Sequence, residues 1–383
     1  MKKSFTLILS FAFIAQVFAQ DTTKAKKPEF KPSGKLWGHV FGDCYFKVHT
    51  DSMGRGSAQY SGLETKANGF DLRRIYLGYD YNISEKFSSE LLVAHEGQVE
   101  PGGNRTVYVK AANVKWKNFL HNTDLIFGLQ STPTFALITD KVWGYRSVEK
   151  SLSDFRGVSK AVDAGIGLQG RFDSTGNFGY NLLLANGSGA KIEADKFKKF
   201  YGDVYLKLAD KKVIIDFYGD YETVQLSPYF KNKWTFKMFL GYQTEDFTIG
   251  IEGYRQMQQN AIIYTDYSDT SGGVIDTGNV SVFGAGIFVR GTIRKDKLSF
   301  FLRADSYDPN TMFSKFFGYA PSYTALNTER FFTVGLDYSP AKNIHVIPNI
   351  WLNSYHSKLD NATKLAKSDM DLVPRLTFYY VFK

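Results

Sequence analysis

The sequence predicts an all-β protein: a 16-stranded antiparallel transmembrane β-barrel with long extracellular loops and short periplasmic turns. Apolar residues recur at every second position along many short stretches, which is the period of a β-strand. The connections between these stretches alternate between long and short. The chain also ends on a strand-like stretch, whose open edge requires a partner.

The closing stretch, 371–382, has one wholly apolar face and one mixed face. The apolar face carries Leu372, Pro374, Leu376, Phe378, Tyr380 and Phe382. The first strand-like stretch, 36–48, is similar in character, so we predict that the two pair and close the sheet on itself. Barrels of this kind usually end on an aromatic residue; here Lys383 follows, and we expect the insertion machinery to recognise Tyr380 and Phe382.

The remaining strands follow in order, each assigned from the same two-residue period. The predicted strands are 36–48, 70–81, 87–96, 105–116, 123–130, 163–172, 178–185, 200–208, 213–222, 234–243, 247–255, 280–291, 298–307, 328–338, 344–353 and 371–382. Eight long connections alternate with seven short ones, as in outer-membrane barrels, and an even strand number places both termini in the periplasm.

Aromatic residues at the strand ends favour a membrane setting, because girdles of aromatic side chains mark the membrane interfaces. These residues are Tyr79, Tyr81, Tyr221, Tyr242, Tyr338, Tyr380 and Phe382. A soluble sandwich or propeller would also contain many short strands, but it has no reason to alternate long and short loops. Sixteen strands leave an aqueous lumen and are too few for a plugged 22-stranded transporter.

The first 34 residues are predicted to precede the barrel. Residues 1–19 form a signal peptide, with two lysines, an apolar core and a small-residue cleavage site. Residues 20–34 are polar, contain two prolines and form a flexible periplasmic leader. The barrel then takes 35–383, in the outer membrane of a Gram-negative bacterium.

Charge and cysteine content narrow the possible partners. The net charge is +9, but the first 34 residues hold six lysines and two acids, which leaves 41 basic and 36 acidic residues, or +5. Because basic residues are interspersed with acids in an exported chain, nucleic acid is not a predicted partner. The single cysteine, Cys44, excludes an internal disulfide, so stability must come from the sheet.

Several segments together resemble the phosphate-selective porin O and P family, in the form found in Bacteroidetes-type bacteria. They are FDLRRIYLGYDY (70–81), DLIFGLQSTP (124–133), YRSVEKSLSDFRG (145–157), VDAGIGLQGRF (162–172), NLLLANGSG (181–189), LSFFLRADSYD (298–308) and the closing strand. The resemblance implies a homotrimeric channel for small hydrophilic solutes or ions, including anions such as phosphate. Its surroundings would be outer-membrane lipid and lipopolysaccharide.

The resemblance also implies that the third extracellular loop, 131–160, folds inward and constricts the pore. Opposite charges facing each other across a narrow pore set a field that sorts solutes by charge. The candidate constriction residues are Lys141, Arg146, Glu149, Lys150, Asp154 and Arg156, with Asp140 as a further acid.

Predicted lumen positions carry both charges. The basic ones are Arg74, Arg171, Lys207, Lys237, Arg303 and Arg375. The acidic ones are Asp80, Asp163, Asp203, Asp216, Asp220, Glu252, Asp305 and Asp337. Because acids are at least as numerous, the residues themselves favour a general porin over a phosphate-selective one.

The sequence gives little support for a nucleotide-binding, metal-binding or catalytic site. The run 165–170 matches G-x-G-x-x-G but lies within a strand, so no helix N-terminus would hold a pyrophosphate. The six histidines lack metal-ligand spacing, and we expect no metal, cofactor or catalytic site. Two alternatives stay open: an outer-membrane lipase or esterase that uses His345 with a serine, and an adhesin or anchor that uses the loops 256–279 and 308–327.

Overall fold

The computed structural model describes residues 29–382, except for 57, 227–228, 267–273, 314–325 and 360–366. From Pro32 onward the chain forms one compact unit. The predicted signal peptide, 1–19, lies outside the described residues and stays a prediction.

Sixteen strands form this unit, as the sequence predicts. They are β1 (Ser33–Phe46), β2 (Asn68–Asn82), β3 (Phe87–His95), β4 (Tyr108–Leu120), β5 (Thr123–Ser131), β6 (Val162–Arg171), β7 (Phe178–Ala185), β8 (Lys199–Leu208), β9 (Val213–Leu226), β10 (Tyr229–Gln243), β11 (Phe247–Asp266), β12 (Val274–Arg294), β13 (Leu298–Asp308), β14 (Asn327–Ala341), β15 (Ile344–Ser357) and β16 (Asp369–Phe382). Two short helices, α1 (Thr139–Trp143) and α2 (Leu152–Phe155), lie between β5 and β6. Among the described residues, no helix has the length and apolar character needed to cross a membrane.

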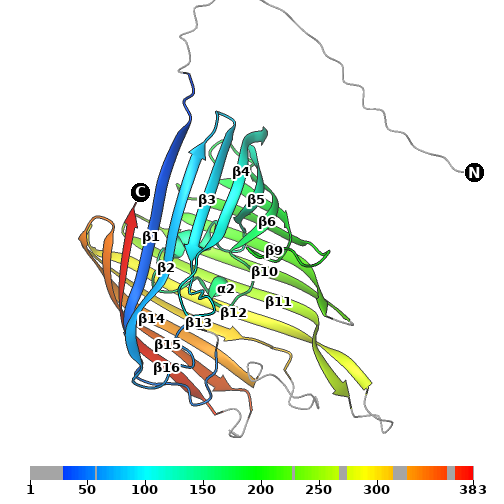
Figure 1. The fold of residues 1–383 in the computed structure, drawn as a ribbon, viewed down its shortest axis with the longest axis vertical. Coiled ribbons are helices and arrows are strands. Elements are labelled where there is room, and N and C mark those ends of the chain that lie inside the picture. The colour runs from blue at the N-terminus through cyan, green and yellow to red at the C-terminus, as the bar shows by residue number, and fades with distance from the viewer. Residues whose placement is uncertain are drawn as a thin grey trace, which may run out of the picture. The chain divides into compact units, whose positions relative to one another are not determined.

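The sheet closes where the first strand meets the last, which confirms the predicted pairing (Figure 1). β1 and β16 are antiparallel, with Gly38 opposite Phe382 and Tyr45 opposite Arg375. Every other strand pairs with its neighbours in the chain. All sixteen strands therefore have a partner on each side, and the barrel wall presents no open backbone edge to lipid.

Apolar side chains point outward along the wall. On β10, Phe236 is 65% exposed and Met238 is 47% exposed, whereas Lys237 between them is 3% exposed. The closing strand follows the same rule, with Phe378 at 49% and Thr377 at 0%. This arrangement is the reverse of that in a soluble protein and confirms the predicted barrel with an apolar exterior.

Short turns join the strands at one end of the barrel. The seven turns are 83–86, 121–122, 172–177, 209–212, 244–246, 295–297 and 342–343, which agrees with the sequence. Three of them place Asn122, Asp296 and Asn343 at φ values of 54°, 59° and 65°. Apart from glycine, asparagine and aspartate adopt this left-handed conformation most readily, so these turns can be tight.

Two predicted long connections are mostly strand. Only residues 227–228 separate β9 from β10, so the expected loop after 222 is wrong. β11 and β12 extend to Asp266 and from Val274, so most of the loop expected at 256–279 is a hairpin that runs past the neighbouring strand ends (Figure 1). Here apolar and polar residues no longer alternate along the sequence, so the pattern that marks a half-buried strand is lost.

Candidate pore and constriction loop

The loop 131–160 crosses the interior of the barrel. Lys237 of β10 donates a hydrogen bond from Nζ to Thr139 Oγ1 at 2.9 Å. Arg375 of β16 donates from Nη2 to the backbone oxygen of Val148 at 3.0 Å. Because both wall residues lie on the buried, inward faces of distant strands, the loop must run between them through the lumen.

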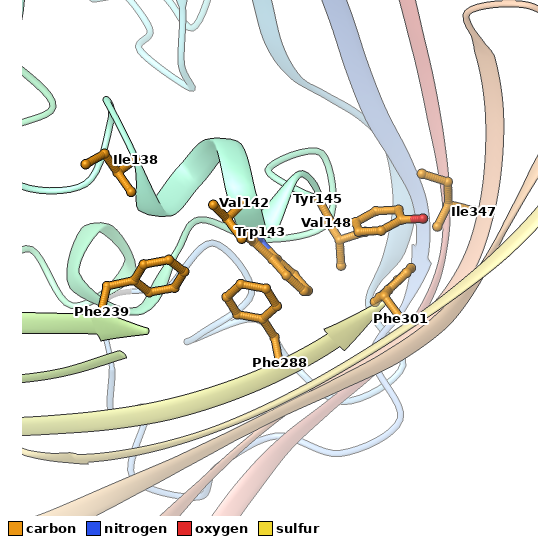
Figure 2. Packing of buried hydrophobic residues seen from close by; sticks show 9 residues of the cluster. All are labelled: Ile138, Val142, Trp143, Tyr145, Val148, Phe239, Phe288, Phe301 and Ile347. Atoms are coloured by element: carbon orange, nitrogen blue, oxygen red, sulfur yellow. The ribbon is translucent and has the colours of Figure 1, made fainter. Parts of the chain in front are cut away.

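An apolar cluster anchors the loop to the wall (Figure 2). Trp143 is fully buried at its centre, 5.0 Å from Phe288 and 6.1 Å from Phe301 between ring centroids. Its Nε1 donates to the backbone oxygen of Glu149 at 2.7 Å, so the buried indole is satisfied. The cluster consists of Ile138, Val142, Trp143, Tyr145, Val148, Phe239, Phe288, Phe301 and Ile347.

Three of the predicted lumen residues fasten the loop. Lys237, Arg303 and Arg375 are all buried in the interior. Arg303 donates to the backbone oxygen of Lys150 and forms an ion pair with Asp305. Their charges therefore serve contacts with the loop and with neighbouring acids, and they are not open to a passing solute.

The other predicted lumen residues occupy different settings. Arg74 lines an interior cavity and pairs with Glu96. Lys207 is half-buried, with its Nζ 5.0 Å from the centre of the Tyr205 ring. Arg171 is exposed at the end of β6. Of the predicted lumen acids, Asp80 is exposed, whereas Asp163, Asp203, Asp216, Asp220, Glu252, Asp305 and Asp337 are buried.

Two interior cavities adjoin beside the loop. The β2-side cavity has a volume of about 460 Å³ and the β4-side cavity about 490 Å³. Arg74, Glu96, Arg146 and Lys150 line both. Together the two cavities are lined by eight basic side chains and four acidic ones: Arg73, Arg74, Arg105, Lys110, Arg146, Lys150, Lys160 and Lys191 against Asp71, Glu96, Glu149 and Asp154.

Arg146 lies at the junction of the two cavities. Its Nη1 bonds Asp140 Oδ2 at 2.6 Å and also bonds Asp154. Lys150 Nζ lies 3.9 Å from Asp154 and its side chain is 33% exposed. The guanidinium group of Arg146 and the ammonium group of Lys150 therefore both face the two cavities.

Three other predicted constriction residues have surroundings different from those of Arg146 and Lys150: Glu149, Arg156 and Lys141. The Glu149 carboxylate is buried and accepts a hydrogen bond from Trp351 Nε1 at 2.9 Å. Arg156 points to the opposite side of the loop, where its Nη1 pairs with Glu329 at 2.6 Å. Lys141 is exposed. Of the six predicted constriction residues, Arg146, Glu149, Lys150 and Asp154 thus line the two basic cavities, whereas Lys141 and Arg156 do not.

Glu96 is the acid at the centre of the basic group. Its carboxylate pairs with Arg74, with Lys110 at 2.5 Å and with Arg146 at 3.9 Å. Burial alone would raise the pKa of Glu96, but these three positive charges outweigh burial and hold the pKa well below its ordinary value. Glu96 therefore remains ionised and partly neutralises the cavity.

Two β-bulges place additional basic residues in the lumen, and strict alternation misses them. On β2 the register with β1 shifts at Phe41 and Gly42, so Arg73 and Arg74 both point inward. Arg73 is buried and pairs with Asp43 at 2.5 Å. A bulge puts two consecutive residues opposite one, which reverses the parity of the strand.

The second bulge lies on β4. Leu92 pairs with Ala111 and Val93 pairs with Val109, which leaves Lys110 unpaired in the ladder and pointing inward. The sequence carries a signal for both bulges: the outward apolar positions change parity, from Leu72 to Ile75 on β2 and from Val109 to Ala112 on β4.

The geometry supports the two alternative functions, an outer-membrane lipase or esterase and an adhesin, less well than it supports a channel. His345 does contact a serine and an acid, but Ser339 Oγ at 3.2 Å and Asp337 Oδ1 at 2.9 Å both approach the same atom, Nδ1. A catalytic relay needs the two on opposite ring nitrogens. Among the described residues, no cluster of three or more histidine, cysteine or acidic side chains is arranged to hold a metal. The loop 308–327 lies largely outside the described residues.

Comparison with known proteins identifies the fold. No family model and no curated protein matches the sequence. The outer membrane channel DcaP of Acinetobacter baumannii matches the structure at 12% identity and TM-score 0.64, over 92% of this chain and 99% of that one. An anion-selective porin from Comamonas acidovorans matches at 10% identity and TM-score 0.59, over 92% and 100%.

A trimer form of OmpT, an outer membrane protein of Vibrio cholerae, matches at 11% identity and TM-score 0.57, over 92% of this chain and 99% of that one. All three similarities cover nearly the whole of both chains, so they concern the complete barrel. With its closed 16-stranded sheet, apolar exterior and polar interior, the chain has the fold of an outer-membrane porin.

Proposed function

We propose that this protein is an outer-membrane channel for passive diffusion of small hydrophilic solutes, with a preference for anions. The observation that carries the proposal is the excess of basic side chains, eight against four, around the two cavities beside the loop. Charged rings at a narrow point raise the local concentration of counter-ions and set ionic preference. The anion-selective porin among the structural neighbours is consistent with this preference.

Inorganic phosphate is a specific candidate for the anion. Arg74 and Arg146 present two guanidinium groups to the same space, and such groups match the geometry of phosphate oxygens. Glu96 opposes this by pairing with both. We therefore propose moderate phosphate binding in a channel that also admits other anions.

The proposed assembly is a homotrimer surrounded by lipid and lipopolysaccharide in a Gram-negative outer membrane. The apolar exterior requires a lipid environment. The OmpT neighbour exists in a trimer form, which supports the trimer for this chain. Native mass spectrometry of detergent-extracted protein tests this assembly.

The channel is tested in a planar bilayer with a tenfold gradient of potassium chloride, where the reversal potential reports ionic preference. We expect the wild-type protein to conduct and to favour chloride. Arg146→Glu and Lys150→Glu together should move the reversal potential toward the value for potassium, because they reverse two charges in the cavities. Lys295→Glu, on an exposed turn, is the matched control and should leave the potential unchanged.

Absence of conductance by folded wild-type protein would overturn the channel function. A wild-type reversal potential that favours potassium would overturn the anion preference alone. Addition of phosphate to the chloride solution should reduce the chloride current, and an unchanged current would remove phosphate as a ligand.

A further inference from the structure

We propose that the connection between β1 and β2, residues 47–67, is a second constriction element, and that Gln59 is a specificity-determining residue of the pore. This inference rests on the proposed channel function. The described part of the connection excludes only residue 57. The sequence pattern alone predicts only a polar extracellular loop for this segment.

The tip of the connection lies inside the barrel. Tyr60 is 1% exposed, and its hydroxyl donates to Asp43, an inward-facing residue of β1. The Tyr60 ring lies 5.2 Å from that of Tyr45 and 5.8 Å from that of Trp351, between centroids. Trp351 is fully buried on β15, which is two strands from β1 in the closed sheet, so the connection folds inward against this part of the wall.

Buried charges hold the connection in this position. Lys47 Nζ donates at 2.6 Å to the backbone oxygen of Tyr60 and at 2.6 Å to Asp371 Oδ1, and both charged side chains have 0% exposure. Asp371 also accepts from the backbone nitrogen of Asp51 at 3.0 Å and from the Tyr355 hydroxyl at 2.9 Å. A loop with this many buried polar contacts is fixed in place and does not drift above the pore.

The connection and the constriction loop meet and divide the interior. Phe155 of α2 and Tyr60 both contact the Trp351 ring, at 6.4 and 5.8 Å between centroids. Ala58 and Phe155 line the β2-side cavity and also a third cavity of about 410 Å³ beside β12, the β12-side cavity. The two segments therefore form the partition between these two spaces.

The two spaces differ in charge. The β2-side cavity is lined by five basic and three acidic side chains. The β12-side cavity has a single pair of charged residues, Arg156 and Glu329, which bond each other at 2.6 Å. By separating them, the connection directs an anionic solute to the basic side of the partition.

Gln59 is the side chain of the connection that faces this basic passage. It is exposed, lines the β2-side cavity and donates from Nε2 to Asp71 Oδ2 at 2.7 Å. Arg146 and Lys150 of the constriction loop line the same cavity. A charge at position 59 would therefore act on the same ions as those two residues.

The test introduces a charge at this position by cysteine modification. In a Cys44→Ala background, Gln59→Cys is incorporated into a planar bilayer and treated with an anionic or a cationic methanethiosulfonate reagent. We expect the anionic reagent to lower the anion current roughly twofold or more and to shift the reversal potential toward that of potassium. The cationic reagent should shift it in the opposite direction.

Glu64→Cys is the matched control, because Glu64 is exposed on the same connection and lines none of these cavities. Its modification should leave the current unchanged. No effect at position 59, or an equal effect at both positions, places the connection outside the ion path and overturns this inference while the channel function stands. If the unmodified variants fold but do not conduct, both proposals fall together.

Discussion

At the residue scale, the balance of charge in the candidate pore depends on a few side chains whose partners are known. Glu96 holds Arg74, Lys110 and Arg146 around one carboxylate. The same four side chains line the β4-side cavity. A single carboxylate thus sets how much of the positive charge is available to a solute.

We predict that Glu96→Gln increases the preference for anions. At an effective dielectric constant of about 20, a unit charge roughly 10 Å from an ion changes its energy by about 1.7 kcal/mol, in opposite directions for chloride and potassium. The ratio of chloride to potassium permeability should therefore rise by roughly tenfold or more. Reversal potentials measure this ratio. Glu100→Gln, in the same connection but exposed, should not alter it.

The pH dependence follows from the same residue. Because the pKa of Glu96 is held well below its ordinary value, the carboxylate stays ionised as the pH falls from about 7 to about 5. An acidic group whose pKa is lowered in the folded state stabilises that state at pH values above its ordinary pKa. This stabilisation is lost only as the pH falls through the lowered pKa. The anion preference of the wild-type channel should therefore not change between about pH 7 and about pH 5 as a result of Glu96 protonation. If lowering the pH over this range reproduced the effect of Glu96→Gln, the lowered pKa of Glu96 would be contradicted.

At the element scale, the bulge on β2 makes a prediction about chain deletion. Deleting Arg73 removes the extra residue and leaves Leu72, Arg74 and Ile75 facing outward, inward and outward, as they do now. Deleting Tyr76 instead turns Leu77 and Tyr79 into the lumen, because a one-residue shift exchanges the two faces of a strand.

We expect the Arg73 deletion to assemble and the Tyr76 deletion to fail. Folded barrels migrate differently on gels before and after heating, so the heat-dependent shift measures assembly. Equal assembly of the two variants would show that the register of β2 is not set by its apolar face.

The loop 131–160, the proposed constriction, is the second element with a testable anchor. Trp143→Ala removes a fully buried side chain and should cost about 3–5 kcal/mol of packing within the loop cluster. Because the sixteen strands keep their pairing, we expect the barrel to remain while the loop loosens.

Single-channel recording should then show a larger and noisier conductance for Trp143→Ala, with a wild-type gel shift on heating. Phe172→Ala serves as the control, since Phe172 is an exposed aromatic residue in the turn 172–177. Unchanged conductance in Trp143→Ala would mean that the loop does not limit the flow of ions.

At the scale of the whole molecule, stability depends on an exterior that matches lipid. Met238 is 47% exposed on the outward face of β10, between the outward Phe236 and Leu240. We predict that Met238→Lys destabilises the barrel in bilayers by up to about 2–4 kcal/mol, because a lysine on the lipid face loses its hydration.

Equilibrium unfolding by urea in lipid vesicles measures this change in free energy. Met238→Leu keeps the apolar character and should lie within about 1.5 kcal/mol of the wild type. A neutral effect of lysine would place this face in contact with water or with another protein subunit.

Much of the fold could be predicted because each strand carries its own alternation. The count of sixteen strands, the outward apolar face and the pairing of the first and last strands all follow from that local period. The hairpin of β11 and β12 could not be predicted in the same way, since apolar and polar residues do not alternate along the sequence where it runs past the wall.

The sequence by itself determined which side of each regular strand faces lipid, because alternation along a strand depends only on neighbouring residues. Only the tertiary structure decided what fills the lumen. Glu149 meets Trp351 across 202 residues, and Lys47 meets Asp371 across 324. The inward course of the 47–67 connection depends on such distant contacts, and closure of the barrel is what brings these partners together.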